Sequence, residues 1–153
     1  MCYFCTNNQC LNMGEMQIRW VQRLSTFGKT LSRLTEVVDL YHGRSLSNLE
    51  KDGMIQRFEY TLEAAWKLLK NYAEYQNGEQ VMGSRDAIRK AFAMGIIENA
   101  NPWFDMVESR NLTSHVYDED TEADIIDKII TTYYPILQDL FDSLRLRAEA
   151  EGV

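Results

Sequence analysis

Cysteine is missing from almost all of this 153-residue chain: the three cysteines, Cys2, Cys5 and Cys10, all lie in the first ten residues. A set of disulfides holding the body of the protein together is therefore excluded. Cys2-x-x-Cys5 has half of a zinc-binding spacing, but no second pair and no nearby histidine completes four ligands. We expect residues 1–15 to form a flexible leader that binds no metal.

Positive charge is also scarce, with 16 Lys and Arg against 23 Asp and Glu and a net charge of −7. General nucleic-acid coat proteins gain affinity from an excess of Lys and Arg, so any contact with RNA must be local. No window approaches the roughly 18 uninterrupted apolar residues of a membrane helix. The first residues lack the basic and apolar regions of a secretion signal, which predicts a cytoplasmic protein without a membrane partner.

Apolar residues recur every three or four positions in most of the chain, which is typical of amphipathic helices. Between the first two helices we expect a polar loop over 44–52. The expected helices cover residues 16–41, 52–76, 84–94, 101–110 and 121–147, with Ser84, Asn101 and Thr121 as N-terminal caps and a bend at Pro135. No strand pair is expected.

Three long and two shorter helices predict an all-α protein, an up-and-down helical bundle of about four to five helices. We expect one domain over residues 16–147, followed by a tail over 148–153. Di-iron bundles carry Glu-x-x-His pairs, and the sequence contains none. No cofactor is therefore expected.

The segment from Arg110 to Tyr117 concentrates the residues most suited to chemistry. Arginine holds a phosphoryl group through its planar fork of donors, and histidine transfers protons near neutral pH. In a straight helix Arg110 and His115 would lie about 140° apart around the axis. They could share a site if the helix loosened near Ser114 or if the histidine faced a second subunit. A twofold dimer would supply two histidines and two arginines, enough for metal-free RNA cleavage by a base, an acid and a cation.

A structural interpretation competes with this hypothesis, because a single Arg-x4-His spacing often arises by chance. In that interpretation Arg110 forms an ion pair with Glu108, Asp118 or Asp120, and His115 is a surface residue or a helix cap. The acidic residues after Tyr117 would favour a helix N-terminus through the helix dipole. The cations Arg85, Arg89 and Lys90 would extend a phosphate-binding face or, more simply, lie on a solvated surface.

Two segments taken together resemble a known family. Arg110-x4-His115-x-Tyr117 resembles the signature of the HEPN superfamily, and residues 55–67, IQRFEYTLEAAWK, are similar to the second helix of its nucleotidyltransferase substrate-binding subunits. With Ala87–Phe92 and Trp103, the similarity extends over residues 16–146.

The resemblance implies a homodimeric helical bundle paired with a minimal nucleotidyltransferase. In related toxin–antitoxin pairs the helical protein is a metal-independent ribonuclease, silenced when its partner transfers AMP to the tyrosine of the motif. Transferred to this chain, Arg110 and His115 would be catalytic, Asn111 would orient the phosphate and Tyr117 would accept AMP. The resemblance equally allows a noncatalytic subunit that presents substrate to the nucleotidyltransferase.

Overall fold

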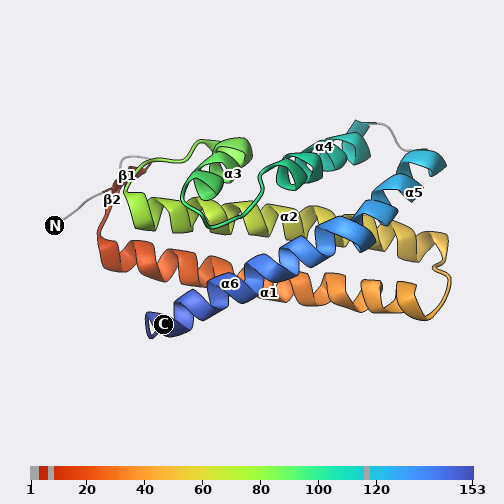
Figure 1. Ribbon diagram of the computed structural model, residues 1–153, viewed down its shortest axis with the longest axis horizontal. Helices are drawn as coiled ribbons and strands as arrows, with labels where there is room; N and C mark the ends of the chain where they lie inside the picture. Colours follow the sequence, from red (N-terminus) through yellow and green to blue (C-terminus); the bar gives the residue numbers. More distant parts are fainter. Residues whose placement is uncertain (1–3, 7–8, 116–117) are drawn as a thin grey trace.

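The computed structural model describes residues 4–6, 9–115 and 118–153, with side chains described for 12–114 and 118–153. Apart from a short hairpin, the described elements are helices packed against one another (Figure 1). The elements are β1 (Phe4–Thr6), β2 (Gln9–Leu11), α1 (Met13–Gly43), α2 (Asn48–Asn77), α3 (Gly83–Ala93), α4 (Asn101–His115), α5 (Glu119–Lys128), the π-helix η1 (Ile129–Tyr133) and α6 (Tyr134–Ala150). The predicted all-α helical bundle is confirmed.

The hairpin of β1 and β2 lies inside the segment predicted to be a leader. Its strands are antiparallel, and Cys5 is paired with Cys10 in the register. Strands of three residues are too short to show the alternation by which a strand is recognised in a sequence, so the hairpin was not expected. The predicted domain limits, residues 16 and 147, stay predictions.

The two longest helices, α1 and α2, form an antiparallel pair along the length of the molecule (Figure 1). Helix α2 begins at Asn48, so the predicted loop over 44–52 is wrong in its second half. The cause is a reciprocal cap: Ser47 Oγ accepts from Glu50 N at 3.1 Å, and Glu50 Oε1 accepts from Ser47 N at 3.0 Å. Gly78 ends the helix with a φ of 68°, a conformation that favours glycine.

The predicted apolar stripes form the core. Trp20, Phe27 and Leu34 of α1 are fully buried and face a similar stripe from α2 that includes Phe58 and Leu62. Helix α6 crosses α1 obliquely, whereas α3 and α4 lie along α2 (Figure 1). Helix α4 is thereby held against α2, and its C-terminal half carries Arg110, Asn111 and His115.

The last predicted helix is divided into α5, η1 and α6. Pro135 lies in the first turn of α6, directly after the π-helix. Proline cannot donate the i to i−4 hydrogen bond, and a locally widened turn accommodates that loss. The predicted bend therefore takes the form of a π-helical turn.

All three predicted caps are wrong, and Asn101 is the first residue of α4 rather than its cap. Asp118 caps α5 in place of Thr121, because Asp118 Oδ1 accepts from Thr121 N at 2.7 Å. Helix α3 begins at Gly83 without a side-chain cap at its N-terminus, so Ser84 is already helical. Acidic residues in the first turn of α5 agree with the predicted decoration of a helix N-terminus. Among the described residues, no helix combines the length and apolar content needed to cross a membrane.

Candidate functional site

Helix α4 is anchored at its start by buried side chains. Trp103 is 2% exposed and Met106 is completely buried. Phe104 N donates to Ala100 O at 3.0 Å, and Asn101 N donates to Asn99 Oδ1 at 3.1 Å. Asn101 is thus the first helical residue rather than the cap, and the helix leads from this apolar anchor to Arg110.

Arg110 joins α4 to α2 through an acidic side chain that the sequence analysis did not single out. Arg110 Nη2 lies 3.7 Å from Glu63 Oε2, and the Arg110 side chain is 43% exposed. The Nε atom of Arg110 is buried and has no hydrogen-bond partner among the described residues. Glu63 also binds Lys67 Nζ at 2.8 Å. The inner nitrogen of the Arg110 guanidinium is therefore buried, whereas its outer nitrogens face solvent and the Glu63 carboxylate.

In the described part of the chain, Arg110 does not pair with the nearby carboxylates that the structural interpretation expected. Glu108 pairs with Arg85 of α3, and Asp118 caps α5. Glu63 is 47 positions from Arg110 in the sequence, so inspection of the neighbouring residues could not identify it. Lys67 is the main cause, and Arg110 a lesser one, of a pKa of Glu63 below its usual value. Glu63 is thus a carboxylate at neutral pH, and a bound phosphate would compete with it for Arg110.

Two hydroxyl groups close the last turn of α4 around the carbonyl of Arg110. Thr113 Oγ1 lies 2.7 Å from Arg110 O and 2.9 Å from Glu59 Oε1 of α2. Ser114 Oγ donates to Arg110 O at 3.2 Å. The backbone remains helical through His115, so α4 does not end at Ser114. The arrangement in which His115 faces a second subunit stays a prediction, because the His115 side chain lies outside the described residues.

The remaining predicted site residues are placed only in part. Asn111 is exposed on α4, next to Arg110. His115 is the final residue of α4, but its side chain lies outside the described residues, as does the whole of Tyr117. Arg110 and Asn111 are thus the predicted residues whose side chains can be located, whereas the roles of His115 and Tyr117 stay predictions.

A polar cluster built on the buried side chains of Tyr133 and Ser109 fixes α4 against η1, and sequence reasoning missed it. Tyr133 Oη lies 2.7 Å from Ser109 Oγ and donates to Asp105 Oδ2 at 2.5 Å. Asp105 also pairs with Lys128 at 3.5 Å. Burial and the hydrogen bond to Asp105 raise the pKa of Tyr133. Because Ser109 directly precedes Arg110, this cluster sets the position of the arginine. The sequence placed Tyr133 on an apolar stripe and so identified it only as a core residue.

The cations of α3 serve a structural purpose. The guanidinium carbons of Arg85 and Arg89 lie 6.0 and 5.8 Å from the ring centre of Phe104 on α4, and Arg85 also pairs with Glu108. Lys90 pairs with Asp86 at 3.5 Å. The contacts of Arg85 and Arg89 join α3 to α4, whereas the Lys90–Asp86 pair lies within α3. Within the described residues, no group of three or more His, Cys, Asp or Glu side chains is arranged to hold a metal.

The family follows from these features together with the sequence match. Residues 22–146, which include α4 and the Arg110 segment, match the family described as "Nucleotidyltransferase substrate binding protein like". The chain belongs to this family, whose members have a HEPN-like fold.

Particular relatives agree with this assignment. The chain is 32% identical over 72 residues to the "Probable ribonuclease HepT" of Haemophilus influenzae, a match covering 44% of this chain and 49% of the relative. The matched segment thus spans about half the length of that curated protein. A crystal structure from Thermus thermophilus is 32% identical, with a TM-score of 0.66 over 79% of this chain and 97% of the other.

Two further solved structures show the same fold at low identity. One is a mutant of the toxin–antitoxin pair MntA–HpeT, 16% identical with a TM-score of 0.68, covering 83% of this chain and 97% of its own. The other is a tri-AMPylated HEPN toxin from Shewanella oneidensis in complex with its MNT antitoxin, 17% identical with a TM-score of 0.67, covering 83% and 96%. These likenesses establish the fold.

Proposed function

We propose that this chain is the ribonuclease subunit of a toxin–antitoxin pair and that it acts as a homodimer. The observation that carries the proposal is the position of Arg110: its half-exposed guanidinium lies five residues before His115, the final residue of α4, in a chain of the HEPN-like family. The similarity to a probable ribonuclease supports the same reaction class. RNA is the substrate.

The proposed reaction uses the 2′-hydroxyl of RNA as the nucleophile. One histidine takes the 2′-hydroxyl proton, the 2′-oxygen attacks phosphorus, and the bond from phosphorus to the 5′-oxygen breaks. A second histidine, from the partner subunit, protonates the leaving 5′-oxygen, and a 2′,3′-cyclic phosphate remains. Arg110 stabilises the charge that develops on the phosphoryl oxygens, and Asn111 orients the phosphate. His115 is proposed for both proton-transfer roles, one copy for each.

Silencing is proposed to be covalent. A minimal nucleotidyltransferase partner would join AMP to the Tyr117 oxygen, which attacks the α-phosphorus of ATP and releases pyrophosphate. The added phosphate brings negative charge and bulk two positions from His115, where it would compete with RNA for Arg110. Complexes of HEPN toxins with MNT antitoxins, one of them AMPylated, support this partner and this modification.

Cleavage is tested with purified protein, single-stranded RNA and a metal chelator. We expect the wild-type protein to cleave and His115→Ala to lose at least about a hundredfold in rate, as general acid–base groups typically contribute. His42→Ala is the matched control, since His42 is the other histidine of the chain and lies at the end of α1. Equal cleavage by the wild-type protein and His115→Ala would refute the catalytic part.

The alternative function is a noncatalytic subunit that presents substrate to the nucleotidyltransferase, and the description of the matched family favours it. It predicts affinity for the partner without RNA cleavage. Mass spectrometry after co-expression with the partner separates the two: AMP on Tyr117, absent in Tyr117→Phe and retained in Tyr41→Phe, supports the toxin. An unmodified chain that still binds its partner supports the alternative.

A further inference from the structure

A groove between α1 and α2 carries positive charge in a protein that is otherwise acidic. Its volume is about 440 Å³, and its lining includes Arg23, Lys29 and Arg33 from α1 and Tyr60, Glu63 and Lys67 from α2. Four cations and one carboxylate give this lining a net charge of +3, against −7 for the chain. We call it the α1/α2 groove. Such a local reversal of sign attracts an anionic ligand.

Two of the cations are free to bind such a ligand. Lys29 and Arg33 are exposed, and within the described residues neither side chain is paired with a carboxylate. Arg33 contributes only its carbonyl, which accepts from Arg57 Nη1 at 2.6 Å. Arg23 Nε donates to the neutral amide of Asn71 at 3.1 Å and keeps its full charge. The charge of this surface is therefore only partly neutralised within the protein.

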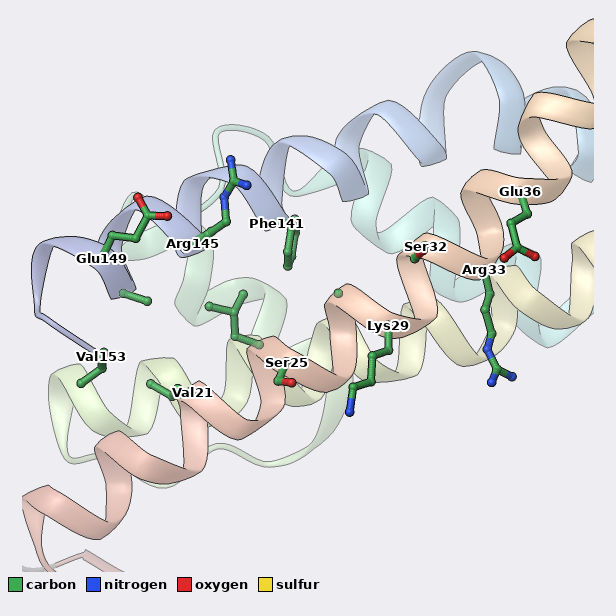
Figure 2. A pocket seen from close by; sticks show the side chains of 13 residues that line it. Val21, Ser25, Lys29, Ser32, Arg33, Glu36, Phe141, Arg145, Glu149 and Val153 are labelled. Carbon is green, nitrogen blue, oxygen red and sulfur yellow. The ribbon is translucent and has the colours of Figure 1, made fainter.

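Lys29 and Arg33 also line a larger hollow of about 780 Å³ between α1 and α6, so the two hollows adjoin along α1. Figure 2 shows Lys29 and Arg33 extending from α1 away from Phe141 and Arg145 of α6. Phe141 instead lies over the α1 backbone at Gly28, where an added Cβ would come within 2.8 Å of the ring. The free cations Lys29 and Arg33 thus stand at the border of the two hollows and extend away from α6.

The groove is continuous with the candidate site. Glu63 lines the groove and at the same time binds Lys67 at 2.8 Å and Arg110 at 3.7 Å. A chain of charged side chains thus runs from α1 across α2 to the end of α4. A polyanion lying in the groove would meet Arg110 at one edge.

We propose that the α1/α2 groove binds the sugar–phosphate backbone of single-stranded RNA beside the bond that is cleaved at Arg110. This inference rests on the proposed ribonuclease function and adds a substrate-binding surface to it. Arg23 and Arg33 are ten residues apart, a rise of about 15 Å along α1. The cations are therefore spaced so that several phosphates of one extended RNA strand can contact them. Tyr60 of the same lining is half-buried and offers a ring on which a base can stack.

The test measures binding separately from cleavage. The ligand is a 2′-O-methyl oligoribonucleotide, which keeps the phosphates but lacks the nucleophilic hydroxyl, and affinity is followed by fluorescence anisotropy at several salt concentrations. Lys29→Gln/Arg33→Gln should weaken binding at least about fivefold and lower the slope of log affinity against log salt by about 1.4, at about 0.7 per phosphate contact. Lys51→Gln/Arg145→Gln removes the same charge elsewhere and should leave both values unchanged.

Cleavage of unmodified RNA supplies the second readout. Because the groove binds substrate and transition state alike, its double variant should raise KM and leave kcat near the wild-type value. A wild-type protein that binds the oligonucleotide through the groove but cleaves no RNA would refute the ribonuclease and leave the groove assignment standing. Cleavage with an unchanged KM, or unchanged oligonucleotide affinity in Lys29→Gln/Arg33→Gln, would overturn the groove assignment. Unchanged RNA affinity with lost affinity for the nucleotidyltransferase would instead identify an acidic protein as the occupant.

Discussion

Arg110 Nη2 lies 3.7 Å from Glu63 Oε2, so the candidate catalytic cation on α4 is held by a carboxylate of α2. Both side chains are about two-fifths exposed, at 43% and 40%, which limits the energy of this pair through solvent screening. The contact can therefore be exchanged for a phosphate at small cost. Glu63 also lines the α1/α2 groove, where it is the single carboxylate and the other charged lining residues are cations.

Glu63→Gln should strengthen RNA binding. The substitution removes a charge that competes with phosphate for Arg110 and Lys67, and we expect an affinity gain of about two- to fivefold, the range of an exposed ion pair. Anisotropy with the 2′-O-methyl oligonucleotide measures it. Glu98→Gln, an equal change of charge at an exposed position outside the groove, is the control. An affinity that stays constant or falls in Glu63→Gln alone would show that the carboxylate does not oppose RNA.

Tyr133→Phe should destabilise the protein by about 1–3 kcal/mol, because Ser109 and Asp105 lose a hydrogen-bond partner in a largely buried cluster. Urea unfolding monitored by circular dichroism gives the value. Tyr134→Phe is a matched control: its hydroxyl lies 2.9 Å from Thr35 Oγ1 in a less buried setting, so the loss should be smaller. Equal losses of unfolding free energy in the two variants would show that the Tyr133 cluster stabilises the protein no more than the Tyr134–Thr35 hydrogen bond does.

Alkaline pH provides a second check on the same residue. The pKa of Tyr133 is raised in the folded protein, chiefly by burial, so folding favours the protonated phenol. Its contribution to stability is complete below the usual tyrosine pKa of 10.0 and is lost as the pH rises above that value. The stability difference between the wild-type protein and Tyr133→Phe should therefore shrink above pH 10. A difference that grows with pH would contradict the assigned direction.

Ser47→Ala should lower the free energy of unfolding by about 1 kcal/mol, the usual contribution of a helix N-terminal cap. Ser47 Oγ accepts from Glu50 N at the start of α2. Ser32→Ala, an exposed serine within α1, should be neutral or slightly stabilising, because alanine has the higher helix propensity. Thermal unfolding of both variants distinguishes a cap from a general effect of losing a hydroxyl.

Glu50→Gln tests the acidic half of the same cap through its pH dependence. Hydrogen bonds from Arg44 and then from Ser47 lower the pKa of Glu50 from 4.5 to about 2. A lowered carboxyl pKa stabilises the folded state above pH 4.5, and the contribution disappears as the pH falls toward 2. The wild-type protein should thus exceed Glu50→Gln in stability at pH 7, and the two should converge near pH 2. Curves that remain parallel across this range would rule out the carboxylate as the cause.

The helices were predictable because burial follows a helical period along them. Phe27 and Leu34 fall on one stripe of α1, and Phe58 and Leu62 on one stripe of α2. The start of α2 was missed, although Ser47 and Glu50 have the spacing of a capping box, because the polar composition of the segment was interpreted as a loop. The π-helix could not be predicted, since it adds only one residue to a turn, and a spacing of four residues also occurs in an ordinary helix.

The sequence predicted which residues of the Arg110 segment could act in a site, but it did not predict which residues of other helices contact them. Arg110 was identified from the chemistry of its own segment, which needs no knowledge of the fold. Its partner Glu63 and the supporting Tyr133 come from other helices, and only packing brings them to α4. The α1/α2 groove was likewise outside the reach of composition, because Lys29 and Lys67 become neighbours only when two helices pair.

Mixed dimers would decide whether one site needs a histidine from each subunit. The α4 backbone is helical through His115, and a regular helix places Arg110 and His115 about 140° apart. If His115 of one subunit is the base and His115 of the other is the acid, a dimer with one His115→Ala subunit lacks one of the two proton transfers. Co-refolding wild-type protein with an equal amount of His115→Ala should then leave about a quarter of the all-wild-type cleavage rate, because about a quarter of the dimers carry both histidines. The same mixture made with His42→Ala should keep the full rate. A remaining rate of about half, with subunit exchange verified by mass spectrometry, would show that each subunit cleaves RNA with its own histidine.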